Sequence, residues 1–253
     1  MKICVVNQKG GVGKTTVSVN LTYGLAKAGK RTLLIDLDPQ GHASVIYLPE
    51  VPPGRTVNEL FADSQVPLAE LIHPAQVGGV PVEHLSLIPA NIRLSLTAEA
   101  VVSRKFRERL LERKLKAVEG EYDFIVMDCL PSLNTIAVNA LYTTEFVLIV
   151  TDYGRYSLDG MADLFATLDE VKEGQAYTFK ILRNKFRAST TKTNEYVEAQ
   201  LAPVREHLLG TVIRNTEAIA QSQMAGDPVL VYDPRGNGAA DFAALTAEIL
   251  RHG

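Results

Sequence analysis

The chain has 253 residues, of which 46% are hydrophobic and 22% are charged, and its formal net charge is −3. This composition is typical of a globular protein with a substantial core, and it excludes a chain that is basic overall, so any nucleic-acid contact must come from a local patch. The N-terminal apolar run is too short for a signal peptide, and no stretch approaches the roughly 20 apolar residues of a membrane helix. Two cysteines, Cys4 and Cys129, provide neither a disulfide framework nor a four-ligand metal site, and we expect a cytoplasmic protein.

Buried strands and helices alternate along the chain. A strand over residues 2–6, a glycine-rich stretch over 9–13, a helix over 14–28 and a strand over 31–37 come first. This order predicts a βαβ unit with parallel strands and a right-handed crossover. A region rich in proline and polar residues follows at 48–81. The remaining predicted strands are 85–89, 124–128, 146–151, 179–183 and 210–213, and the remaining predicted helices are 57–61, 94–117, 157–173, 193–207, 216–225 and 239–251.

The alternation of strands and helices predicts the fold class. The sequence contains no internal repeat, low-complexity tract or interdomain linker, so residues 1–253 are assigned to a single domain. Its predicted fold is α/β and doubly wound, with a mostly parallel sheet and helices on both faces. In such open sheets ligands bind at the carboxyl ends of the strands, where functional residues are therefore expected.

A phosphate-binding loop is predicted between the first strand and the first helix. Its glycines let the backbone wrap closely around phosphates, and the N-terminus of the helix adds partial positive charge. The Lys14 ammonium is expected to reach the β- and γ-phosphates, and the Thr15 hydroxyl to coordinate Mg²⁺. A glycine-rich turn with an incidental lysine is the alternative, but strand, loop and helix all fall where phosphate binding requires them. The predicted nucleotide-binding residues of the loop are Gly10, Gly11, Val12, Gly13, Lys14, Thr15 and Thr16.

Three aspartates stand at the ends of two predicted strands. Asp36 and Asp38 lie at the end of the second strand, and Asp128 ends an apolar strand in the manner of a Walker B motif. All three are expected beside the phosphate loop, at the carboxyl edge of the sheet. Asp128 is predicted to act on Mg²⁺ directly or through water. A helix cap or a turn is the alternative for Asp36 and Asp38.

These motifs resemble those of the ParA/MinD superfamily, whose members are ATPases with a deviant Walker A motif. Lys-Gly-Gly-Val-Gly-Lys-Thr at 9–15 is similar to that motif, with Gln8 where the usual phosphate loop has its first glycine. Asp-Leu-Asp-Pro-Gln-Gly at 36–41 and Asp-Cys-Leu-Pro-Ser-Leu at 128–133 resemble two further signatures, with Leu130 in place of a proline. The resemblance covers nearly the whole chain and is strongest to the short, Soj-like chromosomal ParA type. The later stretches that resemble the family are 152–153, 157–160 and 232–239.

The resemblance implies a homodimer that holds ATP and Mg²⁺ between its subunits. Lys9 would then cross the interface to the phosphates of the partner's ATP, since two facing nucleotides need cations between them. A solvated loop lysine is the alternative for Lys9. Asp38 would orient or activate the attacking water, and Asp36 would support the loop and the Mg²⁺ shell. The predicted catalytic residues are Lys9, Lys14 and Asp38, and the predicted metal-site residues are Thr15, Asp38 and Asp128.

The resemblance also implies contacts to the base and to DNA. Asn184 follows a buried strand, where the family often has a side chain that contacts adenine, although a turn residue is the alternative. Short ParA proteins bind DNA without sequence preference as ATP dimers, through lysine and arginine contacts to phosphates. Glu217 stands where the family usually has a second arginine, and a solvated cluster remains the alternative for this surface. The predicted DNA-binding residues are Arg183, Lys185, Arg187, Lys192 and Arg214.

Four functional hypotheses follow from these observations. The leading one is Mg²⁺-dependent ATP hydrolysis that drives chromosome or plasmid partition, slow alone and stimulated by a ParB-like partner. The second is positioning of another cargo, such as a protein organelle or a chemoreceptor cluster. A metabolic ATP-dependent ligase of the same superfamily is third, and an iron–sulfur ATPase is weaker because Cys4 and Cys129 lie in predicted core strands. The C-terminal segment 243–253 is typical of a helix packed on the core, so we expect nucleoid association and no membrane partner.

Overall fold

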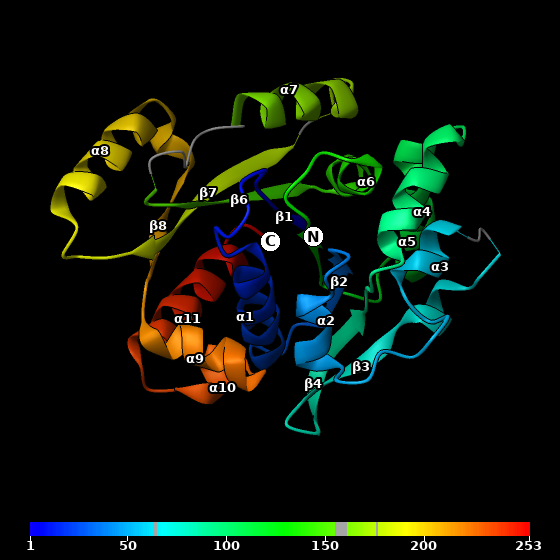
Figure 1. The fold of residues 1–253 in the computed structure, drawn as a ribbon, viewed down its shortest axis with the longest axis horizontal. Helices are drawn as coiled ribbons and strands as arrows, with labels where there is room; N and C mark the ends of the chain where they lie inside the picture. The colour runs from blue at the N-terminus through cyan, green and yellow to red at the C-terminus, as the bar shows by residue number, and fades with distance from the viewer. Residues whose placement is uncertain (63–64, 155–160, 176) are drawn as a thin grey trace.

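The computed structural model describes residues 1–62, 65–154, 161–175 and 177–253. Within these ranges the strands form one eight-stranded sheet in the order β3-β4-β2-β5-β1-β6-β7-β8 (Figure 1). All neighbouring strands are parallel except β3 and β4, which are antiparallel, so the predicted mostly parallel sheet is confirmed. The strands are β1 (Lys2–Val6), β2 (Thr32–Leu37), β3 (His73–Val77), β4 (Val80–Ile88), β5 (Phe124–Cys129), β6 (Phe146–Asp152), β7 (Thr178–Phe186) and β8 (Leu208–Arg214).

Helices cover both faces of the sheet (Figure 1). The central strand β1 shows why, because its residues alternate between two apolar layers: Ile3 and Val5 belong to one buried cluster, and Cys4 and Val6 to the other. The first cluster packs under α1 and α11, and the second under α6 and α7. The helices are α1 (Lys14–Lys27), α2 (His42–Tyr47), α3 (Val57–Ala62), α4 (Leu94–Ala100), α5 (Leu110–Leu115), α6 (Thr135–Thr143), α7 (Met161–Lys172), α8 (Thr191–Leu201), α9 (Glu217–Ala225), α10 (Val229–Tyr232) and α11 (Asn237–Leu250).

Most predicted elements are confirmed to within a few residues, but several helices and one strand were not predicted. The helices α2, α6 and α10 and the edge strand β3 lie where no element was expected. The β3–β4 hairpin falls in the region that reads as proline-rich and polar, and Gly78 and Gly79 make its turn with φ values of 57° and 78°. The part of the predicted helix at 157–160, which also carries one family-like stretch, lies outside the described residues.

The single long helix predicted over 94–117 is wrong. The structure has two short helices, α4 and α5, with 3₁₀ turns and extended backbone between them. The guanidinium of Arg104 donates to the carbonyl oxygens of Phe61 and Ala62 at the end of α3, and its backbone is extended, with a ψ of 142°. Phe106 has a φ of 55°, which a right-handed helix excludes. Contacts to α3 therefore override the helical periodicity of this segment.

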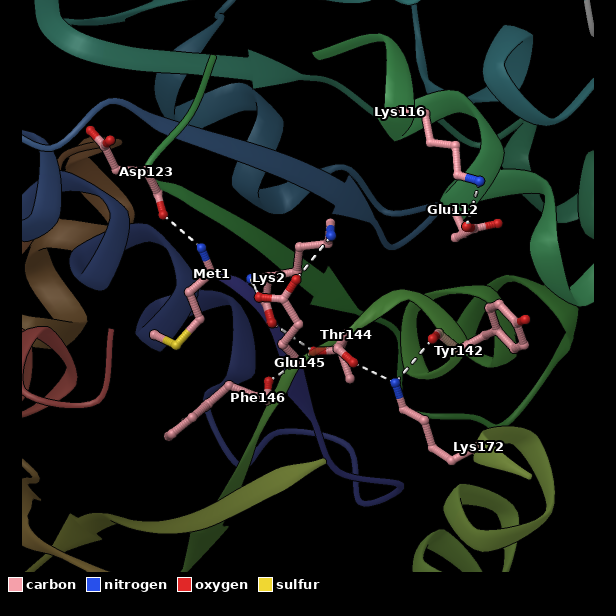
Figure 2. Close-up of polar contacts among 10 residues, drawn as sticks. All are labelled: Met1, Lys2, Glu112, Lys116, Asp123, Tyr142, Thr144, Glu145, Phe146 and Lys172. Carbon is pink, nitrogen blue, oxygen red and sulfur yellow. Dashed lines mark hydrogen bonds and ion pairs between the residues drawn. The ribbon is translucent and has the colours of Figure 1, made fainter. Parts of the chain in front are cut away.

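The amino edge of the sheet is fixed by charged and polar contacts (Figure 2). The Met1 ammonium donates to the carbonyl oxygen of Asp123 at 2.8 Å, which ties β1 to the start of β5. The Lys2 ammonium pairs with Glu145 at 2.9 Å, which ties β1 to the start of β6. These contacts hold three central strands in register, so that their carboxyl ends meet at the opposite edge.

Candidate active site

The loop between β1 and α1 is shaped by two glycines with positive φ. Gly11 and Gly13 have φ values of 74° and 97°, a region that residues with a Cβ rarely adopt. A Cβ on Gly13 would also collide with the amide nitrogen of Asn184. Gly13 precedes the first turn of α1 and caps it without a side-chain hydrogen bond, so the amides at this helix N-terminus remain available to an anion.

Lys14 places a buried cation at the start of α1. The residue is only 6% exposed, and its ammonium donates to the carbonyl oxygen of Lys9 at 3.2 Å. Burial lowers the pKa of Lys14, and the nearby negative charges of Asp128 and Asp38 oppose this shift. An anion that enters the loop would therefore stabilise this desolvated ammonium.

Asp36 and Asp128 are fully buried at the ends of the paired strands β2 and β5. Asp36 accepts hydrogen bonds from the backbone N–H groups of Asp38 and Ser44 and from the Ser44 hydroxyl, so its role is to hold the turn into α2. Burial raises the pKa of Asp36 to about 6. For Asp128, burial first and the neighbouring Asp36 second raise the pKa to about 7.

The surroundings of the two carboxylate oxygens of Asp128 test whether Mg²⁺ fits this site. Oδ1 accepts a hydrogen bond of 2.8 Å from the Ser18 hydroxyl, whereas Oδ2 is buried and has no hydrogen-bond partner among the described residues. The Thr15 hydroxyl lies near enough to lower the pKa of Asp128 but makes no hydrogen bond to Oδ2. Within the described ranges no cluster of three His, Cys, Asp or Glu side chains could bind a metal. A carboxylate and a hydroxyl without such a cluster suit Mg²⁺, which takes most of its ligands from phosphates and water.

Asp38 lies at the rim of the same site. Its Oδ1 accepts a hydrogen bond of 2.9 Å from the N–H of Gln40, and its backbone N–H is bound to Asp36. The side chain lines the cavity together with Thr15, so a carboxylate faces the space where the end of a polyphosphate would lie. This position suits a group that orients an attacking water.

One cavity of about 490 Å³ joins the loop, Asp38 and the end of β7. Its volume is in the range of ordinary small-molecule sites. Helix α9 and the turn before it form one wall of this cavity, and this wall was not predicted from the sequence. Thr216 caps α9 by accepting a hydrogen bond from the N–H of Ile219, and Gln223 donates from its amide to the Thr16 hydroxyl at 2.6 Å. Cavity-lining residues not predicted from sequence are His42, Pro131, Asn215, Thr216, Ile219, Ala220 and Gln223.

Asn184 lies at this cavity, as predicted from sequence, and contacts the loop. Its amide donates to the carbonyl oxygen of Val12 at 2.8 Å, and it is 4% exposed. The side chain therefore supports the phosphate loop directly, and its contact with adenine remains a prediction.

Lys9 points away from its own loop. Its ammonium forms an ion pair of 2.8 Å with Asp152, at the end of β6, and the two side chains are 29% and 18% exposed. Lys9 is not among the residues that line the cavity, whereas Lys14 is. The two loop lysines thus have different surroundings, and contact of Lys9 with a partner's ATP remains a prediction.

The predicted DNA-binding residues lie near the ends of β7 and β8 but have different partners. Arg183 is 16% exposed, pairs with Glu198 and donates to the carbonyl oxygen of Leu209. Arg214 forms a forked ion pair with Asp241. The remaining three are placed as follows: Lys185 donates to Gly11 in the phosphate loop, Arg187 faces the amide of Asn215, and Lys192 is exposed on α8.

The two cysteines are packing residues, as predicted. Cys4 and Cys129 are buried on neighbouring strands with their sulfurs 3.3 Å apart. The contact with Cys4 and burial raise the pKa of the Cys129 thiol well above its usual value, which makes it a poor nucleophile. Among the described residues, no helix combines the length and apolar character that crossing a membrane requires.

Comparison with known proteins agrees with this geometry. A family model described as an AAA domain matches residues 1–181. The chain is 34% identical to the sporulation initiation inhibitor protein Soj of Bacillus subtilis, over 99% of this chain and 98% of Soj. It is 32% identical to the chromosome partitioning protein ParA of Myxococcus xanthus, over 98% of this chain and 87% of ParA.

A solved structure gives the same fold with ligands in place. The cobyrinic acid a,c-diamide synthase of Mycobacterium smegmatis, crystallised with ADP and magnesium, superposes with a TM-score of 0.82 at 26% identity, covering 99% of this chain and 94% of that one. ATP and Mg²⁺ are therefore ligands of this protein, and the residues around Asp128 and Thr15 fit the metal. The chain belongs to the ParA/MinD superfamily of deviant Walker A proteins, is Soj-like within it, and is an ATPase that hydrolyses ATP with Mg²⁺.

Proposed function

We propose that this ATPase works as an ATP-dependent pair of subunits that binds DNA without sequence preference. Residues 1–253 act as one ATPase domain, and a ParB-like partner stimulates hydrolysis, so that the cycle drives partition of a chromosome or plasmid. The identity of 34% to a protein named Soj and of 32% to one named ParA, over 98% and 87% of their lengths, supports this function. In this cycle the bound triphosphate keeps the two subunits together, and its cleavage lets them separate.

The position of Lys9 is the observation that carries the proposal. Lys14 already supplies the cation of its own phosphate loop, while Lys9 is paired with Asp152. This partly buried ion pair holds the Lys9 ammonium near the surface that the phosphates of a second subunit would approach. Release of Lys9 from Asp152 would let it bind those phosphates, which carry more negative charge than one carboxylate.

The exposed part of the loop supports close approach by another molecule. Gly10 and Gly11 are both exposed, and a Cβ on either would meet no atom of this chain within 4 Å. The space around Gly10 is thus not required by packing within the subunit. A bound phosphate or a second backbone at this surface would need that space.

The proposed DNA face is centred on the surface beside β7 and α8. Lys185, Arg187 and Lys192 are exposed there, although Lys185 also donates to Gly11 and Arg187 faces the amide of Asn215. Arg183 and Arg214 are half-buried and form ion pairs within the chain. Pairing of subunits would double any such surface, and two weak sets of phosphate contacts bind together far more tightly than one. ATP-dependent pairing would therefore make DNA binding depend on ATP.

Binding to non-specific DNA tests this function. We expect retention of the protein on DNA with ATP and Mg²⁺, weak retention with ADP or without nucleotide, and a steep loss of binding as salt rises from about 50 to 200 mM. Binding that is the same in all three nucleotide states would contradict the proposal. A ParB-like protein encoded nearby, added with DNA, should raise the rate of ATP hydrolysis.

A metabolic ATP-dependent ligase is the competing function, and the structural similarity to the diamide synthase is the observation that favours it. Hydrolysis that responds to a small carboxylic acid and not to DNA or a partner protein would support a ligase. Positioning of a cargo other than DNA uses the same cycle as partition, and identification of the stimulating partner separates the two.

A further inference from the structure

The end of β7 places a lysine with an unusual backbone against the phosphate loop. Lys185 has a φ of 60°, in the left-handed region that residues with a Cβ rarely adopt. Its ammonium donates a hydrogen bond of 2.6 Å to the carbonyl oxygen of Gly11, and the residue lines the nucleotide cavity. A backbone in this conformation persists where its surroundings hold it, and such residues concentrate at functional sites.

Asn184, the residue before Lys185, makes a second contact with the phosphate loop, and the two contacts together are called the clamp. The Asn184 amide donates to the carbonyl oxygen of Val12, the next one along the loop after Gly11. The backbone N–H of Lys185 donates to Asn184 Oδ1 at 2.9 Å, which fixes the orientation of that amide. Two successive carbonyl groups of the loop are thus held by two successive residues of β7.

Because of the geometry of the peptide bond, the clamp also sets the direction of two backbone N–H groups of the loop. In a trans peptide the C=O and N–H groups point in opposite directions. Holding the carbonyl groups of Gly11 and Val12 toward β7 therefore fixes the direction of the N–H groups of Val12 and Gly13. Backbone N–H groups of this loop are the donors that bind phosphates.

We propose that Lys185 is a positioning residue for the phosphate loop. Its ammonium holds the Gly11 carbonyl so that the loop amides are oriented before the nucleotide arrives, which lowers the cost of ordering the loop on binding. The proposal rests on the ATPase activity and requires neither subunit pairing nor DNA. It gives Lys185 a task in the nucleotide site in place of the DNA contact predicted from the sequence.

Three variants test the clamp. Lys185→Asn removes the ammonium but tolerates the left-handed backbone, Lys185→Arg keeps a cation, and Lys105→Asn removes an exposed lysine between α4 and α5 as the matched control. The affinities for ADP and for a non-hydrolysable ATP analogue are measured by calorimetry. In the nucleotide-free protein, hydrogen exchange of the backbone amides in residues 7–17 reports the order of the loop itself.

We expect Lys185→Asn to weaken both nucleotides equally, by about three- to tenfold, because one hydrogen bond to a charged group is lost. Exchange in the loop should rise without nucleotide, Lys185→Arg should restore most of the affinity, and Lys105→Asn should match the parent chain. If Lys185→Asn does not fold, Lys185→Gly suits the same backbone and makes the same test.

Two results would overturn the proposal. Unchanged nucleotide affinity and loop exchange in Lys185→Asn would exclude a role of Lys185 in positioning the phosphate loop. Equal losses in Lys185→Asn and Lys185→Arg would show that the cation is not the cause. Since neither readout uses DNA or a partner protein, failure of the proposed partition function leaves this inference intact.

Discussion

Lys172 shows how one buried charge can support an element that the active site depends on. The residue is 3% exposed, and its ammonium donates to the carbonyl oxygens of Tyr142, at 3.0 Å, and Thr144, at the end of α6 (Figure 2). Burial lowers the pKa of Lys172, but a cation at a helix C-terminus is favoured by the unpaired carbonyl groups there. Helix α6 packs directly against β1 and β5, the strands that lead to the site.

We predict that Lys172→Met lowers the free energy of unfolding by about 1–3 kcal/mol, because two buried carbonyl groups lose their donor. Urea unfolding of the nucleotide-free protein measures this. Lys116→Met is the control, since Lys116 is 63% exposed and pairs with Glu112 on the same helical segment (Figure 2), a contact worth at most about 1 kcal/mol. Equal effects of the two substitutions would contradict the capping role.

Asp128 gives the nucleotide-free protein a dependence on pH. Its pKa is raised to about 7 in the folded state by burial, against an ordinary value of 3.8. From about pH 4 to pH 7 the folded state therefore keeps a proton that the unfolded chain loses, and the free energy of unfolding falls as the pH rises. We predict that Asp128→Asn removes this part of the decrease, measured by thermal unfolding across that range.

The same variant tests the metal site. Mg²⁺ added with an ATP analogue should stabilise the parent chain beyond the analogue alone, because bound ligands favour the folded state. In Asp128→Asn this additional stabilisation should be small. An undiminished effect of Mg²⁺ would exclude Asp128 from the metal site.

At the scale of elements, α9 is the part of the site that comes from farthest along the chain. Its Gln223 is bound to Thr16 of α1, while Gln221, on the same helix, contacts Glu217 and Tyr232 instead. Gln223→Ala removes the bond that holds α9 against the nucleotide cavity. We predict a rise in KM for ATP of about three- to tenfold with little change in kcat, since the bond supports the wall of the cavity and involves neither Lys14 nor Asp38.

Gln221→Ala is the matched control for this prediction, and steady-state ATPase kinetics measures both variants. A fall in kcat at constant KM for Gln223→Ala would contradict a role in binding alone. The same fall in both variants would indicate general loosening of α9.

Elements fixed by local pattern were predictable, and those fixed by distant contacts were not. The apolar runs of β1, β2 and β5 stand out because strands buried on both faces are continuously hydrophobic. The interruption between α4 and α5 depends on Arg104, whose partners lie on α3, more than 40 residues earlier in the chain. The helical period of that segment contains no sign of those partners.

The active site divides in the same way. The phosphate loop and Asp128 carry their chemistry in short motifs, and the structure brings the loop and Asp38 together in one cavity, with Asp128 beside it. Gln223 and Lys185 belong to the site only because α9 and β7 meet the loop in three dimensions. The ion pair of Lys9 with Asp152 was not predicted either, because its two residues follow different strands and lie 143 positions apart.

At the scale of the whole molecule, the ion pair of Lys9 with Asp152 makes a prediction about subunit pairing. Lys9→Ala should abolish pairing driven by Mg²⁺ and an ATP analogue, while leaving the fold intact. Asp152→Asn should shift pairing to lower analogue concentration, because Lys9 no longer has to leave a carboxylate. Sedimentation or light scattering over a range of analogue concentrations measures both effects.

Lys2→Ala is the control for this experiment. Lys2 also forms an ion pair with an acidic residue of the neighbouring segment, Glu145, but at the opposite edge of the sheet. Pairing should be unaffected by this change. Full ATP-driven pairing of Lys9→Ala would contradict the role of Lys9 between subunits.

The fit between Gly13 and Asn184 has a consequence for how this chain can vary. Position 13 cannot accept a methyl group while an asparagine occupies position 184, and shortening residue 184 would leave the Val12 carbonyl without its donor. The two sites are separated by 171 positions, yet neither tolerates change on its own. A smaller residue at 184 would remove the collision but not the strain of the positive φ at position 13, so in a mutational library of this protein replacements at 13 should be rare even as double variants, and should cost nucleotide affinity.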